Sequence, residues 1–180
     1  MFQQSQRIHV VAFLLAATAW LVAPAHAGQP AVKRVRPADR AMARMLDEGA
    51  RRSSTFKQMV ADLERSDVIV YVTTSRELPR TELGELRFVC ARGGHRYLRA
   101  TIRSRLGPRD FVSTIAHELQ HALEVAAHAE VVDGASMAAL YQRIGRASCS
   151  GYETAAAVRA GDVVGVELER GPATSSTRPR

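Results

Sequence analysis

Hydrophobic positions in the first part of the chain change from a helical to a strand spacing. Residues 38–51 and 53–65 carry apolar side chains three and four positions apart, which predicts two helices. Ser53 or Ser54 is placed to cap the second helix. Residues 68–72 (VIVYV) are β-branched and apolar on both faces, which is typical of a central strand.

The next stretch predicts a β-hairpin. Residues 75–83 are polar and contain a proline, so we expect a loop, and a strand follows over residues 86–91. Gly93 and Gly94 form the turn. In residues 95–103 apolar and polar side chains alternate, so the returning strand has one apolar and one polar face.

The second half predicts three helices. Asp110 is placed to cap the first, which runs to about residue 127. The second covers residues 135–144 and ends at Gly145, and the third covers residues 152–168. This order of elements indicates an α+β fold, with a small antiparallel or mixed sheet packed on one helix and further helices C-terminal to it.

The N-terminus has the layout of a secretory signal peptide. An arginine precedes an apolar run over residues 10–22, and Ala25-His26-Ala27 matches an A-x-A cleavage site. We therefore expect residues 1–27 to be removed on export to the periplasm or the medium, with no stable membrane insertion afterwards. An uncleaved membrane anchor is the alternative.

The remaining chain divides into three parts. Residues 28–37 are basic and contain two prolines, which indicates a linker. Residues 38–170 contain the predicted elements and form one domain. Residues 171–180 are rich in Ser, Thr, Pro and Arg, so we expect a disordered tail.

The chain is basic, with a formal net charge of +7, and nearly all of its positive side chains are arginines. A basic surface can bind polyanions. The arginines, however, are spread along the sequence with little aromatic interleaving, and an export signal argues against nucleic acid as a partner. Cys90 and Cys149 are the only cysteines, and export would allow them to form a disulfide or leave two free thiols.

One motif carries recognisable chemistry: His117-Glu118-Leu119-Gln120-His121. On a helix the two histidines lie one turn apart on the same face, so both imidazoles can bind one ion. Glu118 lies about 100° further round the helix, where it can take a proton from a water on that ion. The spacing predicts a zinc site with Glu118 as the general base.

A zinc site needs a third protein ligand. Glu153 is the first candidate, because it heads an apolar row in the last predicted helix and a buried carboxylate needs a partner. Glu124, one turn beyond His121, is placed to hydrogen-bond that imidazole, and direct ligation by Glu124 is the alternative. His128 is a further candidate, one position beyond the third histidine of the H-E-x-x-H-x-x-G-x-x-H pattern.

The H-E-x-x-H motif at His117, followed by Glu153, resembles the gluzincin branch of the zincin metallopeptidases. The resemblance implies a zincin-like fold over about residues 68–168, zinc as the cofactor, and hydrolysis of peptide bonds in a peptide or protein substrate. The E-x-x-x-D pairing of that branch is absent because Ala157 occupies the aspartate position. Asp133 is then the candidate for supporting a ligand.

The resemblance also implies that an edge strand holds the substrate backbone. If residues 95–103 form that strand, Arg99 and Arg103 would favour acidic substrates, or would only protect the edge from aggregation. The candidates for stabilising the oxyanion are Tyr97, Tyr141, Tyr152 and His128. Two other functions remain open: a zinc-binding structural module without catalysis, and a basic protein that binds the cell-envelope surface.

Overall fold

The computed structural model of the protein describes residues 33–148 and 151–170. The predicted signal peptide, the predicted tail and Cys149 lie outside these ranges, and Cys90 is exposed. Within the described ranges, no helix is both long enough and apolar enough to cross a membrane. The fold is α+β, as the sequence predicts, with a mixed four-stranded sheet.

The secondary-structure elements follow the predicted order, with short strands added. In chain order they are β1 (Val35–Pro37), α1 (Arg40–Arg52), α2 (Ser54–Glu64), β2 (Val68–Ser75), β3 (Gly84–Arg92), β4 (His95–Arg103), α3 (Pro108–Ala127), α4 (Gly134–Ile144), β5 (Arg146–Ser148), β6 (Gly151–Glu153) and α5 (Ala155–Arg170). Strands β5 and β6 form a separate two-stranded hairpin.

The main sheet has the strand order β1-β2-β4-β3. Strand β2 is parallel to both β1 and β4, whereas β3 and β4 form the predicted antiparallel hairpin around Gly93 and Gly94. Both glycines have positive φ, at 59° and 74°, as the tight turn requires. Strand β4 therefore lies inside the sheet and β3 lies at its edge.

Residues 95–103 do not form the edge strand, so the condition under which Arg99 and Arg103 would lie beside a substrate backbone at that edge is not met. The pairing of β4 with β2 joins Val70 to Leu98 across a long sequence separation, and hydrophobic spacing contains no information about such a partner. Alternation gave β4 one apolar face correctly, since Leu98, Ala100 and Ile102 are fully buried. The sequence did not indicate that β4 also pairs with β2.

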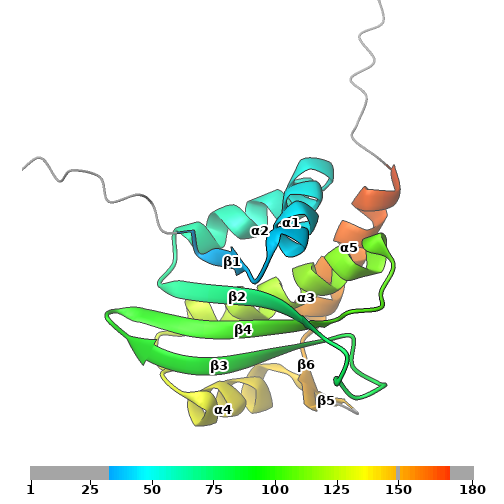
Figure 1. Ribbon diagram of the computed structural model, residues 1–180. Coiled ribbons are helices and arrows are strands. Elements are labelled where there is room, and N and C mark those ends of the chain that lie inside the picture. The colour runs from blue at the N-terminus through cyan, green and yellow to red at the C-terminus, as the bar shows by residue number, and fades with distance from the viewer. Residues whose placement is uncertain (1–32, 149–150, 171–180) are drawn as a thin grey trace, which may run out of the picture. The chain divides into compact units, whose positions relative to one another are not determined.

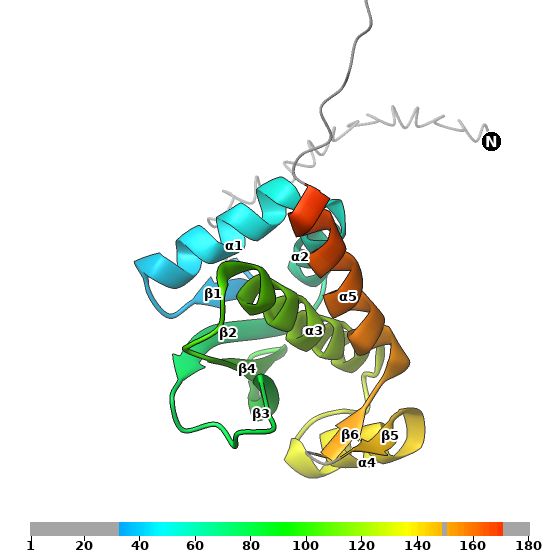
Figure 2. The same cartoon turned by 90° about the vertical axis from the view of Figure 1, so that its right-hand side faces the viewer.

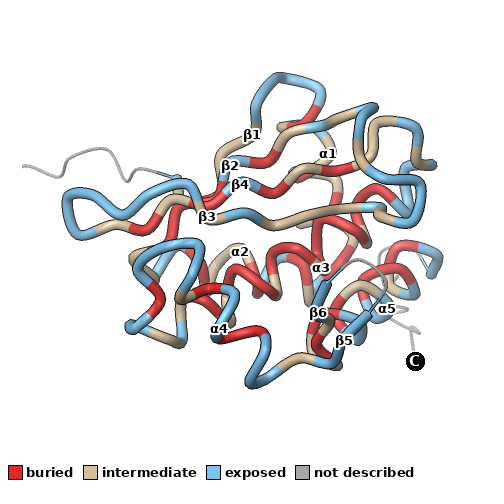
Figure 3. Tube along the Cα trace, turned by 90° about the horizontal axis from the view of Figure 1, so that it is seen from below, coloured by how far each residue is buried: buried red, intermediate tan, exposed pale blue. Residues whose placement is uncertain are grey.

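Helices cover one face of the sheet and leave the other open. Helix α3 packs on β2, β3 and β4, α5 packs along α3, and α1 and α2 pack around both. Figure 1 shows α3 behind the sheet and α4 beyond its β3 edge, and Figure 2 shows α3 and α5 on one side of the strands with α1 above β1. Figure 3 shows α3 buried along much of its length, whereas the edge strand is largely exposed.

Several element boundaries differ from the predictions. The predicted linker contains β1, because Val35–Pro37 pairs with β2. Helix α3 begins at Pro108 after Gly107, so Asp110 lies in its first turn instead of capping it. At α2 the prediction is confirmed, since the Ser53 side chain accepts a hydrogen bond from the Phe56 backbone N–H.

Candidate metal centre

Helix α3 presents both motif histidines to one side because its other side forms the core. Ile115, Leu119 and Ala122 are fully buried beneath the sheet. His117 and His121 therefore project from the opposite side, one turn apart, with ring centroids 4.9 Å from each other. The amphipathic pattern of the helix thus fixes the direction of the imidazoles.

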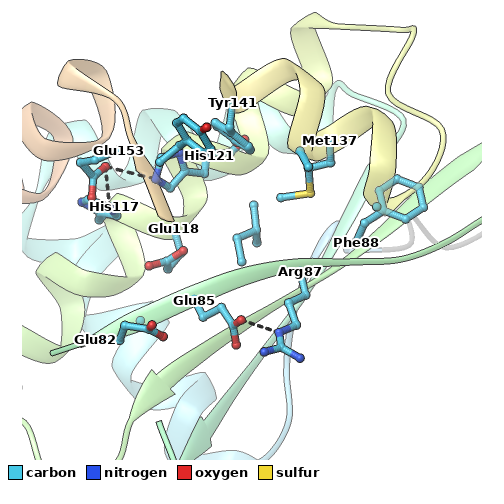
Figure 4. Close-up of a pocket in the computed structure, with 15 residues that line it drawn as sticks. Glu82, Glu85, Arg87, Phe88, His117, Glu118, His121, Met137, Tyr141 and Glu153 are labelled. Atoms are coloured by element: carbon cyan, nitrogen blue, oxygen red, sulfur yellow. Dashed lines mark hydrogen bonds and ion pairs between the residues drawn. The ribbon is translucent and has the colours of Figure 1, made fainter. Parts of the chain in front are cut away.

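Glu153 meets both imidazoles, as Figure 4 shows. Its Oε1 atom lies 3.2 Å from His117 Nε2 and 3.3 Å from His121 Nε2. The glutamate ends strand β6 and does not belong to the last helix, so the prediction of its local structure is wrong. Thr154 caps α5 instead, since its hydroxyl accepts a hydrogen bond from the Ala157 backbone N–H.

Close packing of α5 on α3 holds Glu153 in this position. A β-carbon at Gly161 would lie 3.3 Å from the Ser113 carbonyl oxygen, and one at Gly165 would lie 3.0 Å from Ser113 Oγ. Both distances are tighter than an ordinary van der Waals contact, so larger residues would push the helices apart. The two glycines therefore set the approach of the segment that begins with Glu153.

The three side chains suit a metal ion. One ligand atom from each of His117, His121 and Glu153 can be chosen so that all three lie within 4.8 Å of one another. Two ligands at about 2.05 Å from a tetrahedral zinc ion would be about 3.3 Å apart, close to the two measured separations. Two imidazoles and one carboxylate are also a donor set that zinc accepts while leaving a fourth position open.

The charges at the cluster are strongly coupled. Partial burial raises the pKa of Glu153, but hydrogen bonds to His117 and His121 outweigh burial and hold this pKa well below its usual range. Burial lowers the pKa of His121, but hydrogen bonds to Glu124 and Glu153 outweigh that effect and raise it to about 9. Without a metal, the site thus holds a carboxylate beside a protonated imidazole.

Glu124 fixes the orientation of His121, in keeping with the role expected from its spacing. Its Oε2 lies 2.9 Å from His121 Nδ1, and its Oε1 accepts a hydrogen bond of 2.6 Å from the Thr154 hydroxyl. The Tyr141 hydroxyl donates to the His121 carbonyl oxygen at 2.9 Å. Because His121 Nδ1 is engaged in this way, its Nε2 is the nitrogen directed at Glu153.

Asp133 does not support either histidine, and this prediction is corrected. Its carboxylate caps α4 by accepting hydrogen bonds from the backbone N–H and the hydroxyl of Ser136. His128 also lies outside the cluster: it ends α3, and its Nδ1 is 3.0 Å from Glu130 Oε1.

Glu118 is buried between α3 and the edge strand. It is 4% exposed, and burial raises its pKa to about 7, although His117 and His121 draw the pKa downward. Its carboxyl group has no hydrogen-bond partner among the residues that the structure describes. A carboxyl group with a pKa near neutrality can accept and return a proton, which is what a general base requires.

Two hollows adjoin at the cluster and form one cleft. They have volumes of about 470 Å³ and about 410 Å³, and they share five lining residues. The shared residues are Glu82, Gly84, His117, Glu118 and Glu153. The edge strand β3 forms one wall of the larger hollow, and α4 with the β5–β6 hairpin forms the other.

The three tyrosines that are candidates for oxyanion stabilisation lie in different places, and two of them line the cleft. Tyr97 lies on the open face of the sheet, where it stacks on Tyr71, and does not line either hollow. Tyr141 and Tyr152 line the larger hollow, but the Tyr141 hydroxyl is already bonded to a carbonyl oxygen. Tyr152 is 43% exposed, and its hydroxyl has no hydrogen bond to any residue that the structure describes.

Sequence reasoning missed two residues of the site. Gly84 lies against Glu118, and nothing in the sequence marks it, because the contact depends on strand order. The Thr154 hydroxyl donates a hydrogen bond to Glu124 and accepts one from the Ala157 backbone N–H. Threonine is a favoured N-cap residue, so its place at the start of the last helix could have identified it.

Comparison of the chain with family models, with curated proteins and with solved structures finds no match. Function is therefore inferred from the site itself.

Proposed function

We propose that the protein is a zinc-dependent peptidase of the zincin type, exported through its N-terminal segment. The observation that carries the proposal is the convergence of His117 Nε2 and His121 Nε2 on one oxygen of Glu153, beside the buried carboxyl group of Glu118. These separations match those between ligands of one tetrahedral zinc ion.

Each residue has a distinct task in this proposal. His117, His121 and Glu153 would bind the zinc, which supplies a Lewis acid and an activated water. Glu118 would take the proton of that water and return it to the leaving amine. Glu124 would hold the His121 ring in the orientation that binding needs.

The cleft supports a polypeptide as the substrate. Strand β3 has a free edge next to Glu118, and an extended peptide can add to such an edge through backbone hydrogen bonds. An open edge strand antiparallel to its neighbour, above the helix that carries the motif, is consistent with a zincin-like fold. Within the described residues the ligand group has three members, which supports catalysis over a structural zinc site, because a structural site is closed by four protein ligands.

The first test is the zinc content of the purified protein and of two variants. We expect one zinc per chain in the wild type, loss of zinc in Glu153→Ala, and retention of zinc in Glu118→Gln. Glu77→Ala, at an exposed glutamate in the loop after β2, is the matched control and should keep its zinc. A wild type without affinity for zinc would refute the proposal.

The second test is cleavage of a peptide library by the zinc-loaded protein. Removing the general base should lower kcat by about 10²–10⁴-fold, so Glu118→Gln should be almost inactive. Full zinc occupancy together with equal turnover by wild type and Glu118→Gln would show that Glu118 is not the base.

A further inference from the structure

The open face of the sheet carries a row of basic side chains. Arg36 on β1 lies opposite Tyr71 on β2, Tyr71 lies opposite Arg99 on β4, and Arg99 lies opposite Arg87 on β3. We call Arg36, Arg99 and Arg87 the arginine row. Neighbouring strands are about 4.8 Å apart, so the row spans about 14 Å. No helix of the described chain covers this face, which Figure 1 shows towards the viewer.

The charges of the row are poorly neutralised. Arg99 is exposed, and its side chain has neither a hydrogen bond nor an ion pair to any residue that the structure describes. It lies directly opposite Arg87, and like charges at such positions destabilise a sheet. Among the described residues, the Arg87 side chain pairs with Glu85 of its own strand and with no other carboxylate. A bound anion would relieve this repulsion.

The tyrosines of this face position the arginines. Tyr71 stacks on Tyr97 with ring centroids 6.4 Å apart and an interplanar angle of 18°. The Arg36 guanidinium lies 5.3 Å from the centroid of the Tyr71 ring and donates a hydrogen bond of 2.7 Å to its hydroxyl. These contacts already occupy the Tyr71 ring. The face is therefore better suited to binding charged groups than to stacking against bases or sugars.

Arg103, on the same strand as Arg99, has a structural role. Its guanidinium donates to the backbone carbonyl oxygens of Pro79 and Glu82 and so holds the loop before β3. Arg103 is therefore occupied, whereas Arg99 is free to bind a ligand.

The cleft has the opposite charge. Glu82, Glu85, Glu118 and Glu153 line the larger hollow, together with the two motif histidines. Among the residues that the structure describes, Arg87 is the one arginine or lysine in this lining. Arg87 thus belongs both to the rim of the cleft and to the arginine row. A substrate segment rich in carboxylates would be repelled inside the cleft and attracted just outside it.

We propose that the arginine row is an exosite that binds an acidic segment of the polypeptide substrate, and this inference rests on the proposed peptidase function. The planar guanidinium group pairs with a carboxylate through two parallel hydrogen bonds. Arg99 is the group available for such a pair, and Arg36 and Arg87, which also donate within the protein, add positive charge on either side of it. The exosite raises affinity and association rate, while the cleft performs the reaction.

The binding test uses a fluorescein-labelled peptide of ten glutamates and needs no peptidase activity. Fluorescence anisotropy should show binding to the full chain that weakens as salt is added. We expect at least fivefold weaker binding by Arg99→Gln and loss of binding by Arg99→Glu. Arg159→Gln, at an exposed arginine on α5, is the matched control and should bind as the wild type does. Equal binding by wild type and Arg99→Glu would overturn the proposal.

Two further probes test the chemistry of the partner. A single-stranded oligonucleotide of equal charge, or vesicles of phosphatidylglycerol, should bind more weakly than the glutamate peptide. If either probe binds more tightly than the glutamate peptide, and Arg99→Glu abolishes that binding, the assignment to acidic polypeptide is overturned.

The kinetic test compares a cleavable peptide flanked by five glutamates with one flanked by five glutamines. The wild type should have at least tenfold higher kcat/KM for the acidic peptide through a lower KM, and Arg99→Glu should lose this preference with kcat unchanged. Active enzyme without such a preference would refute the exosite alone. Inactive enzyme that still binds the glutamate peptide through Arg99 would refute the peptidase proposal and leave the binding surface supported.

Discussion

Gly84 on the edge strand lies so close to Glu118 on α3 that no side chain fits between them. A β-carbon at Gly84 would be 2.5 Å from Glu118 Oε1 and 2.7 Å from Thr114 Cγ2. The strand thereby shields the carboxyl group from water, and this burial is the main cause of its raised pKa. Because Gly84 has no side chain, the carboxyl group of Glu118, the proposed base, can occupy this position.

Gly84→Ala should therefore impair catalysis while leaving the ligands intact. The methyl group must displace Glu118 or the strand, and a displacement near 1 Å in an active site can cost about 10²-fold in rate. We expect a fall of about that size in kcat/KM with unchanged zinc content, measured by peptide cleavage and metal analysis. Gly107→Ala is the control, since Gly107 has open space around its α-carbon. Equal losses in both variants would contradict a specific role for Gly84.

Removal of the Glu124 carboxylate should weaken metal binding. Glu124→Ala would leave His121 Nδ1 and the Thr154 hydroxyl without their shared partner. Loss of a carboxylate that orients a ligand histidine usually lowers metal affinity by about 10–100-fold. Competition with a chelating dye would measure it. Glu130→Ala removes a similar carboxylate from His128 outside the cluster and should leave zinc affinity unchanged.

Metal binding should release a proton from His121. The pKa of this histidine is raised to about 9, so the metal-free protein carries the proton at pH 7.5, and a metal ion can bind only the neutral ring. This proton should make the affinity rise about tenfold per pH unit until the pH reaches about 9. Calorimetry in two buffers with different ionisation enthalpies would count the protons. Zinc binding without any proton release would contradict the pairing of His121 with Glu124 and Glu153.

The ion pair between Asp67 and Arg96 should make stability depend on pH. Hydrogen bonding to the Arg96 guanidinium lowers the pKa of Asp67 below its ordinary value of 3.8. A lowered pKa contributes stability that is present above about pH 3.8 and is lost as the pH falls through the folded-state value. Urea unfolding should show wild type more stable than Asp67→Asn at pH 7, with the difference narrowing below pH 4.

A matched control separates this pair from ordinary surface pairs. Asp62 pairs with Arg65 on the exposed side of α2, where such pairs contribute little. Asp62→Asn should hardly change the free energy of unfolding at either pH. By contrast, Arg96 is 6% exposed and also donates to the carbonyl oxygens of Val125 and His128, so its partner matters more.

Local patterns predicted most of the long elements of the fold. The strand at residues 95–103, the end of α3 near residue 127 and the Ser53 cap all follow from side chains close together in the sequence. Strands β1 and β6 have three residues each, too few for a periodicity, so they were not predicted. Strand order depends on distant partners, so the sequence alone could not tell which strand lies at the sheet edge.

The same distinction applies to the site. The spacing of His117 and His121 on one helix places both rings together, and an apolar row downstream pointed to Glu153. The predicted helix start at this glutamate is wrong, because Glu153 ends β6 and precedes α5. Its approach depends on Gly161 and Gly165, whose close contacts with α3 no single-sequence pattern indicates.

The glycine contact between α5 and α3 also links the metal site to the maturation of the chain. Two ligands come from α3, but the third reaches them only when the C-terminal helix has docked through Gly161 and Gly165. A chain in which α5 has not docked would hold the two histidines without the carboxylate. Under the proposed function, metal uptake would then come late in folding, and only a completely folded molecule would have the full set of ligands.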